Sequence, residues 1–376
     1  MPRYLAAVWS VIFAGVVASS GACAATPNGP FEVTPVHEFE QPWALAFLPD
    51  GDLLVTEMRG RLKVYRDGET RDVAGVPEVA FGGQGGFGDV VLHPDFADNA
   101  MVYLSYAEPG DGNTRGAAVA RARLERDADG GGRLADLEVI WRQVPKVSGE
   151  GHYGHRIAFG PDGYLWISSG ERQKMAPSQD MQSNLGKIVR LHDDGRVPAD
   201  NPFADRGGVT AEIWSLGHRN PLGIAFDAEG RLWEHEMGPR NGDELNLVTR
   251  GANYGWPEVS NGRHYSGKDI PDHQPGDGFA APVVTWTPVI SPSSFIIYRG
   301  DEFPAWRGSG LIGGLSSQAL VRVAFDGESA REAERFDMGA RIRAVAEGPD
   351  GALWLLEDGR RGGPGRLLKL TAAPSP

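Results

Sequence analysis

Two histidines lie three residues apart in the segment Glu150-Gly-His-Tyr-Gly-His155, which enters an apolar stretch after Arg156. An imidazole titrates near neutral pH, so His152 suits the role of a general base. The pair could equally bind a metal ion or be purely structural. A zinc site is disfavoured because no Cys, Asp or Glu nearby completes a usual ligand pattern.

A second polar group, Arg219-Asn220, stands directly before Pro221 and another apolar stretch. A guanidinium in this position can stabilise negative charge that develops on a carbonyl oxygen, and the Asn220 amide can act as its hydrogen-bonding partner. The alternative is an arginine that only braces the loop and an asparagine that only forms a turn.

Carboxylates are mixed with Gly, Pro and Asn between Glu236 and Asn246, and the segment Asn253-Tyr-Gly-Trp-Pro257 follows closely. Carboxylate and backbone carbonyl oxygens are the ligands that Ca²⁺ prefers. The spacing is not that of an EF-hand loop, so spacing alone leaves a cation site and an ordinary polar loop equally open.

Two further segments contain residues of types that often contact a bound ligand. Gln84 has glycines on both sides, which let the backbone approach a flat ligand closely. Arg341 and Arg343 alternate along a predicted strand and therefore face the same side, where paired guanidinium groups suit carboxylates. The alternatives are a plain turn for Gln84 and a solvated sheet face for the arginines.

These residues lie near the ends of a recurring sequence motif. The motif consists of an apolar stretch, the turn Pro-Asp-Gly and a second apolar stretch. The motif appears at residues 44–56 and 156–167, and in looser form at residues 222–233 and 345–355. Each copy predicts a strand, a tight turn and a second strand. Units of this kind, spaced roughly 45–70 residues apart, favour a β-propeller of about six blades over a β-sandwich. The strand near residues 31–39 is expected to complete the last blade beside residues 366–370.

Composition supports an all-β fold in a single domain, residues 25–376. The chain has 376 residues, of which 41% are hydrophobic, and contains 52 Gly and 27 Pro. Helix-breaking residues are too frequent for a helical bundle. The formal net charge of −13 argues against nucleic acid or an anionic membrane as a partner, since both require clustered Lys and Arg.

Residues 1–24 have the pattern of an export signal. Arg3 precedes an apolar stretch, and the small residues Ala22 and Ala24 flank Cys23. The apolar stretch is shorter than the roughly 20 residues of a membrane span, so we expect no stable membrane insertion. Cleavage after Ala24 removes the only cysteine and predicts a periplasmic or secreted protein. A lipid anchor on Cys23 is the alternative, disfavoured by Ser20 where a bulky aliphatic residue is usual.

The segments at residues 211–223, 238–244 and 253–257 resemble the soluble quinoprotein sugar dehydrogenases of the glucose/sorbosone dehydrogenase family, most closely the bacterial aldose sugar dehydrogenases. The resemblance covers roughly residues 33–371. It implies a six-bladed β-propeller that binds pyrroloquinoline quinone (PQQ) and calcium. It also implies oxidation of the anomeric hydroxyl of an aldose, a small-molecule substrate.

The resemblance also implies roles for single residues. It makes His152 the general base, while Arg219 and Asn220 bind the cofactor and polarise its accepting carbonyl. Further cofactor contacts are implied for Gln84, Arg341 and Arg343. The implied calcium ligands are the carbonyls of Gly238 and Pro239 for one ion, and Glu244 and Tyr254 for a second, structural ion.

The chain departs from the family pattern at four positions: Gly151, His155, Met237 and Ser316. Ser316 stands where a cofactor-binding lysine is expected, and His155 stands on the substrate side where a small residue is usual. Two other classes compete with the dehydrogenase: a calcium-dependent propeller lactonase and a propeller that only binds carbohydrate or protein. The preferred sugar, the electron acceptor and the oligomeric state are not readable from the residues.

Overall fold

A computed structural model describes residues 29–359 and 363–374, and the predicted export signal lies outside these residues. The described chain is almost entirely strand and turn. It has one short α-helix, α1 (Phe96–Asn99), and short 3₁₀ turns at residues 176–178, 204–206, 208–212 and 304–306. None of the helices in this described part is long and apolar enough to cross a membrane.

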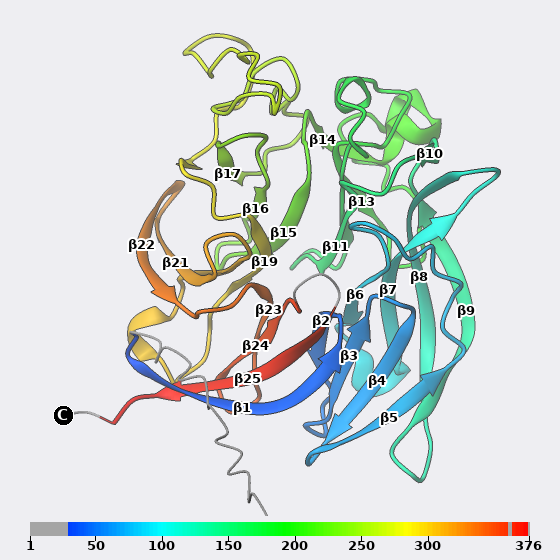
Figure 1. Ribbon diagram of the computed structural model, residues 1–376. Coiled ribbons are helices and arrows are strands. Elements are labelled where there is room, and N and C mark those ends of the chain that lie inside the picture. The colour runs from blue at the N-terminus through cyan, green and yellow to red at the C-terminus, as the bar shows by residue number, and fades with distance from the viewer. Residues whose placement is uncertain (1–28, 360–362, 375–376) are drawn as a thin grey trace, which may run out of the picture.

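Four of the sheets are antiparallel and four-stranded, and they are arranged about a common centre (Figure 1). Three of them are formed by consecutive strands. These are β11 (Gly154–Phe159), β12 (Leu165–Ser169), β13 (Lys187–Leu191) and β14 (Ile213–Leu216); β15 (Pro221–Phe226), β16 (Leu232–Glu236), β17 (Asp243–Leu247) and β18 (Val284–Trp286); and β19 (Pro292–Ile297), β20 (Gly310–Gly314), β21 (Ala319–Asp326) and β22 (Ser329–Asp337).

The fourth sheet joins the two ends of the described chain. Its order is β1 (Phe31–Glu40), β25 (Pro364–Ala372), β24 (Leu353–Glu357) and β23 (Ile342–Glu347). The antiparallel register of β1 and β25 pairs Val33 with Leu370, and Figure 1 shows the two strands side by side. The prediction that the first strand completes the last sheet is therefore confirmed.

The remaining sheet has nine strands, and a narrow contact divides it into two antiparallel parts. One part contains β2 (Pro42–Phe47), β3 (Leu53–Glu57), β4 (Arg61–Arg66) and β5 (Glu69–Ala74). The other contains β6 (Phe87–Leu92), β7 (Met101–Pro109), β8 (Thr114–Arg126) and β9 (Gly132–Arg142), with β10 (Val147–Ser148) beside β8. The parallel pairing of β5 with β9 joins only Val73 with Gly132 and Ala74 with Arg133.

The first strands of these groups pack against one another in a closed order, β2, β6, β11, β15, β19, β23 and back to β2. Apolar side chains fill the space between neighbouring sheets; Trp233 and Leu245, for example, are fully buried against the next sheet. The closed order and the all-β content are consistent with a β-propeller.

Several of the first strands begin with an irregular register, which redirects the chain where it enters the sheet. In β11 the pairing with β12 shifts between Gly154 and Ile157, and His155 adopts a positive φ of 60°. In β15 the shift falls between Pro221 and Gly223. The predicted site residues His152, Arg219 and Asn220 stand directly before these two entries.

Candidate functional site

A cavity of about 640 Å³ opens where these strands begin. Its volume is in the range of a site for a small organic ligand. Four of the predicted cofactor contacts line it: Gln84, Asn220, Arg341 and Arg343. Trp43, Tyr153, His155 and Asp358 also contribute to the wall. His152 and Arg219 are not among the described lining residues; both lie in contact with residues that are.

The loop of Gln84 is held against the loop of His152. The backbone N–H of Gln84 donates to the Glu150 carbonyl at 2.7 Å, and the Gln84 side-chain oxygen accepts the backbone N–H of His152 at 2.8 Å. Gly83 has a φ of +58°, and a Cβ there would stand 2.7 Å from the Glu150 carbonyl oxygen. Glycine at this position is therefore required for the close approach of the two loops.

His152 forms a buried pair with Glu171, which follows β12. The imidazole Nδ1 lies 2.5 Å from a carboxylate oxygen of Glu171, and the two residues are 7% and 1% exposed. The other Glu171 oxygen accepts the backbone N–H of Met175. Two hydrogen bonds therefore fix the carboxylate, and the carboxylate orients the imidazole.

Burial lowers the pKa of His152 below its usual value, although the hydrogen bond with Glu171 opposes this shift. Burial tends to raise the pKa of Glu171, but the hydrogen bond and charge of His152, the hydrogen bond from Met175 and the charge of Arg219 together outweigh it, so the net shift is downward. At neutral pH the pair is thus a neutral imidazole beside an ionised carboxylate, the state that a general base needs. Glu171 was not predicted from the sequence, since nothing in its local pattern distinguishes it.

Arg219 and Asn220 are held by the carboxylate of Glu236, at the end of β16. One oxygen of Glu236 accepts the backbone N–H groups of both Arg219 and Asn220, the latter at 3.0 Å. The Asn220 side-chain oxygen accepts the backbone N–H of Gly154 at 3.2 Å. The Arg219 carbonyl accepts the backbone N–H of Glu171 at 2.9 Å, which links this pair to the His152 pair.

The Arg219 side chain is buried and only partly satisfied. Its Nη1 donates to the Met237 carbonyl at 2.7 Å, whereas its buried Nε has no hydrogen-bond partner among the described residues. A buried donor without a partner is costly unless a ligand accepts from it. The positive charge of Arg219 also contributes to the lowered pKa of His152, so the two side chains are electrostatically coupled.

His155 differs from His152 although both have a positive φ. Its ring stacks on Trp43 with centroids 4.9 Å apart, and its Nδ1 lies 2.8 Å from the Ser105 hydroxyl. Burial lowers the pKa of His155 to about 3. This histidine lines the cavity wall as a neutral packed side chain, which fits the structural alternative for one member of the pair.

On another wall, Arg341 and Arg343 share the carboxylate of Asp358. Their Nε atoms lie 2.8 and 3.3 Å from its two oxygens. Burial tends to raise the pKa of Asp358, but the two arginines lower it. The prediction that both guanidinium groups project to one side is confirmed. Asp358 lies 17 residues after Arg341 and 15 after Arg343, and its role was not predicted from the sequence.

Ser316, at the position of the expected lysine, is exposed and accepts a hydrogen bond from Ser291 at 2.8 Å. Ser291 and the adjoining Leu315 line the cavity. The chain therefore places an uncharged hydroxyl beside this part of the wall, and the two arginines supply the positive charge there.

The four predicted calcium ligands gather around a second, much smaller cavity. Gly238, Pro239, Glu244 and Tyr254 line a space of about 10 Å³, close to the volume that one water molecule or ion requires. Burial and the neighbouring Glu236 and Glu234 carboxylates raise the pKa of Glu244 well above its usual value. A cation bound here would lower that pKa again, and the carboxylate and carbonyl oxygens around the space are donors of the kind that a hard cation such as Ca²⁺ prefers.

Comparison with known proteins agrees with this geometry. The family model described as Glucose / Sorbosone dehydrogenase matches residues 39–369. Aldose sugar dehydrogenase YliI of Escherichia coli (strain K12) is 41% identical over 343 residues, covering 89% of this chain and 91% of the relative. Quinoprotein glucose dehydrogenase B of Acinetobacter calcoaceticus is 28% identical over 406 residues, covering 85% and 83%.

Solved structures give the same result. The apo-form of the soluble aldose sugar dehydrogenase from Escherichia coli has a TM-score of 0.86 and 40% identity, over 91% of this chain and all of that one. The PQQ-bound aldose sugar dehydrogenase from Streptomyces coelicolor has a TM-score of 0.74 and 31% identity, over 92% and 99%.

The family match, the identity with YliI and the fold shared with the aldose sugar dehydrogenase from Escherichia coli identify the chain as an oxidoreductase that acts on sugars. The chain belongs to the Glucose / Sorbosone dehydrogenase family.

Proposed function

We propose that the chain is a PQQ-dependent aldose dehydrogenase that oxidises the anomeric hydroxyl of its substrate to the lactone. The observation that carries the proposal is the buried His152–Glu171 pair. It places a neutral, carboxylate-oriented imidazole next to Gln84 and the Arg219–Asn220 pair, of which Gln84 and Asn220 line the 640 Å³ cavity. A surface that only binds carbohydrate has no use for such a base.

The fold proposed for this function is a six-bladed propeller, in which β1 completes the blade of β23, β24 and β25 and the nine-stranded sheet counts as two blades. The cavity then lies at the hub. We further propose that residues 25–376 form a single catalytic domain, exported after removal of residues 1–24 and periplasmic or secreted.

The residues present fit PQQ and a calcium ion. Arg341 and Arg343 would hold the carboxylates of the cofactor, and Gln84 and Asn220 would hydrogen-bond its ring system. The unsatisfied Nε of Arg219 would donate to its accepting carbonyl. The carbonyls of Gly238 and Pro239 would hold the calcium ion; when bound, the quinone would supply a hydride acceptor and the ion a Lewis acid. We assign a second, structural calcium to Glu244 and the carbonyl of Tyr254.

The chemistry assigned to the protein itself is one proton transfer. His152 directs Nδ1 to Glu171, which leaves Nε2 as the atom that removes the proton from the anomeric hydroxyl. The C1 hydrogen leaves as hydride while the C1–O bond becomes a carbonyl, giving the lactone. Ionised Glu171 stabilises the imidazolium that forms. A base positioned in this way contributes about 10²- to 10⁴-fold in rate.

The proposal is tested by dye reduction with PQQ and Ca²⁺ added to the purified protein, using a panel of aldoses and one sugar lactone. Aldose-dependent reduction is expected, and His152→Gln should lower it about 10²- to 10⁴-fold without weakening PQQ binding. His192→Gln, outside the cavity, is the matched control and should leave it unchanged. Lactone hydrolysis without aldose oxidation would instead identify the chain as a lactonase.

A further inference from the structure

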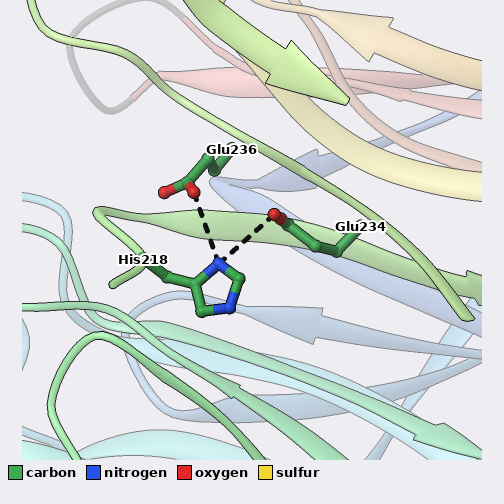
Figure 2. Close-up of side chains that lie close together, drawn as sticks. All are labelled: His218, Glu234 and Glu236. Carbon is green, nitrogen blue, oxygen red and sulfur yellow. Dashed lines mark hydrogen bonds and ion pairs between the residues drawn. The ribbon is translucent and has the colours of Figure 1, made fainter. Parts of the chain in front are cut away.

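A buried cluster of ligand-type side chains lies behind the Arg219–Asn220 pair. His218, Glu234 and Glu236 each have one candidate ligand atom, and these atoms all lie within 4.8 Å of one another. Figure 2 shows the two carboxylates directed toward the same ring nitrogen of His218. The three residues are 0%, 0% and 3% exposed, so water is excluded from this cluster.

The distances in the cluster are poor for hydrogen bonds. The Nδ1 of His218 lies 3.3 Å from Glu234 and 3.4 Å from Glu236, at or beyond the long end of the N–H···O range. A single Nδ1–H cannot point at both oxygens. By contrast, ligand atoms of a four-coordinate ion with bonds of about 2.0–2.1 Å lie about 3.3 Å apart, as they do here.

The outer contacts of His218 also suit a metal ligand. Its Nε2 lies 2.8 Å from the Ser215 hydroxyl, and its ring stacks on Tyr254 with centroids 4.6 Å apart. When Nε2 donates to this hydroxyl, the Nδ1 lone pair is free to coordinate, and the stacked ring fixes the orientation of the imidazole.

Unsatisfied buried acceptors also lie at the edge of the cluster. One oxygen of Glu234 accepts from the Asn246 amide at 2.7 Å and faces His218, but the other oxygen is buried and has no hydrogen-bond partner among the described residues. The Asn246 side-chain oxygen is likewise buried and unpaired. Within the described chain, no Lys or Arg forms an ion pair with Glu234 or Glu236. Protonated His218 balances only one of the two carboxylates, and a divalent ion bound at Nδ1 in place of that proton would balance both.

We infer that His218, Glu234 and Glu236 bind a divalent ion of the zinc class. This site adjoins the small cavity assigned to calcium, which Glu236 also lines, but it uses a different set of ligands. One imidazole nitrogen and two carboxylate oxygens form a common ligand set for zinc, and an all-oxygen set suits calcium. The inference goes beyond the proposed function, because it requires neither PQQ nor sugar.

The ion would stabilise the positions of Arg219 and Asn220 through Glu236. The oxygen of Glu236 that faces His218 would bind the ion, while the other accepts the backbone N–H groups of Arg219 and Asn220. Fixing this carboxylate therefore fixes both backbone amides. The ion has a positioning role and does not touch the proposed substrate.

The test uses purified protein that has been treated with a chelator, returned to excess Ca²⁺ and titrated with Co²⁺ in the absence of PQQ. We expect one Co²⁺ per chain with the visible absorption of four-coordinate cobalt, displaced one for one by Zn²⁺ and not by Ca²⁺. Failure to retain Co²⁺ in excess Ca²⁺, or its displacement by Ca²⁺, would overturn the inference. These outcomes need no variant and leave the proposed function untouched.

The ligand assignment is tested with Glu234→Gln, which keeps the shape of the side chain and removes its charge. We expect Co²⁺ affinity to fall at least tenfold, roughly the lower bound for loss of a metal-site contact. Glu258→Gln, an exposed glutamate on the neighbouring loop, is the matched control and should bind Co²⁺ as the wild type does. Equal Co²⁺ affinity in Glu234→Gln and wild type would contradict the assignment.

Discussion

Two walls of the large cavity are built differently. Asn220 lines the first wall, and His152, Glu171 and Arg219 adjoin it. All four residues are less than a tenth exposed, and hydrogen bonds with backbone groups of other segments help to fix them. On the second wall, the Arg341 side chain is about a third exposed and is held chiefly by an ion pair with Asp358. The groups assigned to proton transfer and charge stabilisation are therefore held by hydrogen bonds and shielded from bulk solvent. The Arg341 side chain is more exposed, and the Arg343 side chain, 13% exposed, is intermediate; both can exchange their ion pair with Asp358 for one with a ligand.

This difference predicts that variants on the first wall change turnover and variants on the second change affinity. The reason is that preorganised groups act on charge that develops during the reaction, whereas an exposed ion pair contributes to binding in every state. The four predictions below test that division, in order of decreasing expected effect.

Arg219→Ala should give the largest of these four effects. Removing a buried donor aimed at developing negative charge lowers turnover by about 10²- to 10³-fold. Cofactor affinity should fall by a smaller factor. Steady-state kinetics at saturating PQQ and a separate PQQ titration distinguish the two quantities. An unchanged turnover number would place Arg219 with the second wall.

Arg343→Ala should weaken PQQ binding and leave turnover at saturating PQQ close to wild type. Loss of one charged hydrogen bond of about 1.5–3 kcal/mol corresponds to a rise in Kd of roughly 10- to 150-fold. Isothermal titration of the apo-protein with PQQ measures it. Arg331→Ala, on the outer strand β22, is the control. A fall in turnover at saturation would show that the second wall also acts in the chemical step.

Glu171→Gln should lower kcat/KM by about tenfold or more, the cost of removing the partner that orients an imidazole. Because the hydrogen bond with Glu171 raises the pKa of His152 against the effect of burial, the variant should lower that pKa further. The acid limb of the pH–rate profile should therefore move to lower pH. An acid limb at the wild-type position would exclude direct coupling of the two residues.

His155→Asn should have the smallest effect, and it should be on stability. His155 has a pKa of about 3 in the folded chain and an ordinary value near 6.5 when unfolded. The unfolded chain therefore takes up a proton that the folded chain does not as pH falls from 6.5 toward 3, at a cost of up to about 1.4 kcal/mol per pH unit. Urea unfolding across this range should show a shallower loss of stability in the variant. Equal slopes would contradict the account.

Local sequence patterns predicted much of the frame and part of the site. The Pro-Asp-Gly turns gave the hairpins, and the alternation of Arg341 with Arg343 placed both side chains on one face, as their shared ion pair with Asp358 shows. The closing pair of β1 with β25 was also predicted correctly.

The partners of the site residues were not predictable in the same way. Glu171 meets His152 across 19 positions, and Glu236 meets Asn220 across 16. Each contact joins the open ends of the two strands of one hairpin and depends on the irregular register where the first strand begins, which no local period encodes. The different fates of His152 and His155 likewise depend on tertiary partners: Glu171 for the first, and Trp43 with Ser105 for the second.

Rapid mixing of the PQQ- and calcium-loaded protein with an aldose, followed by absorbance of the bound quinone in a single turnover, tests the central role of His152 most directly. We predict rapid sugar-dependent reduction in the wild type. In His152→Gln, with PQQ still bound, reduction should be about 10²- to 10⁴-fold slower. Equal reduction rates in the two proteins would show that His152 is not the base.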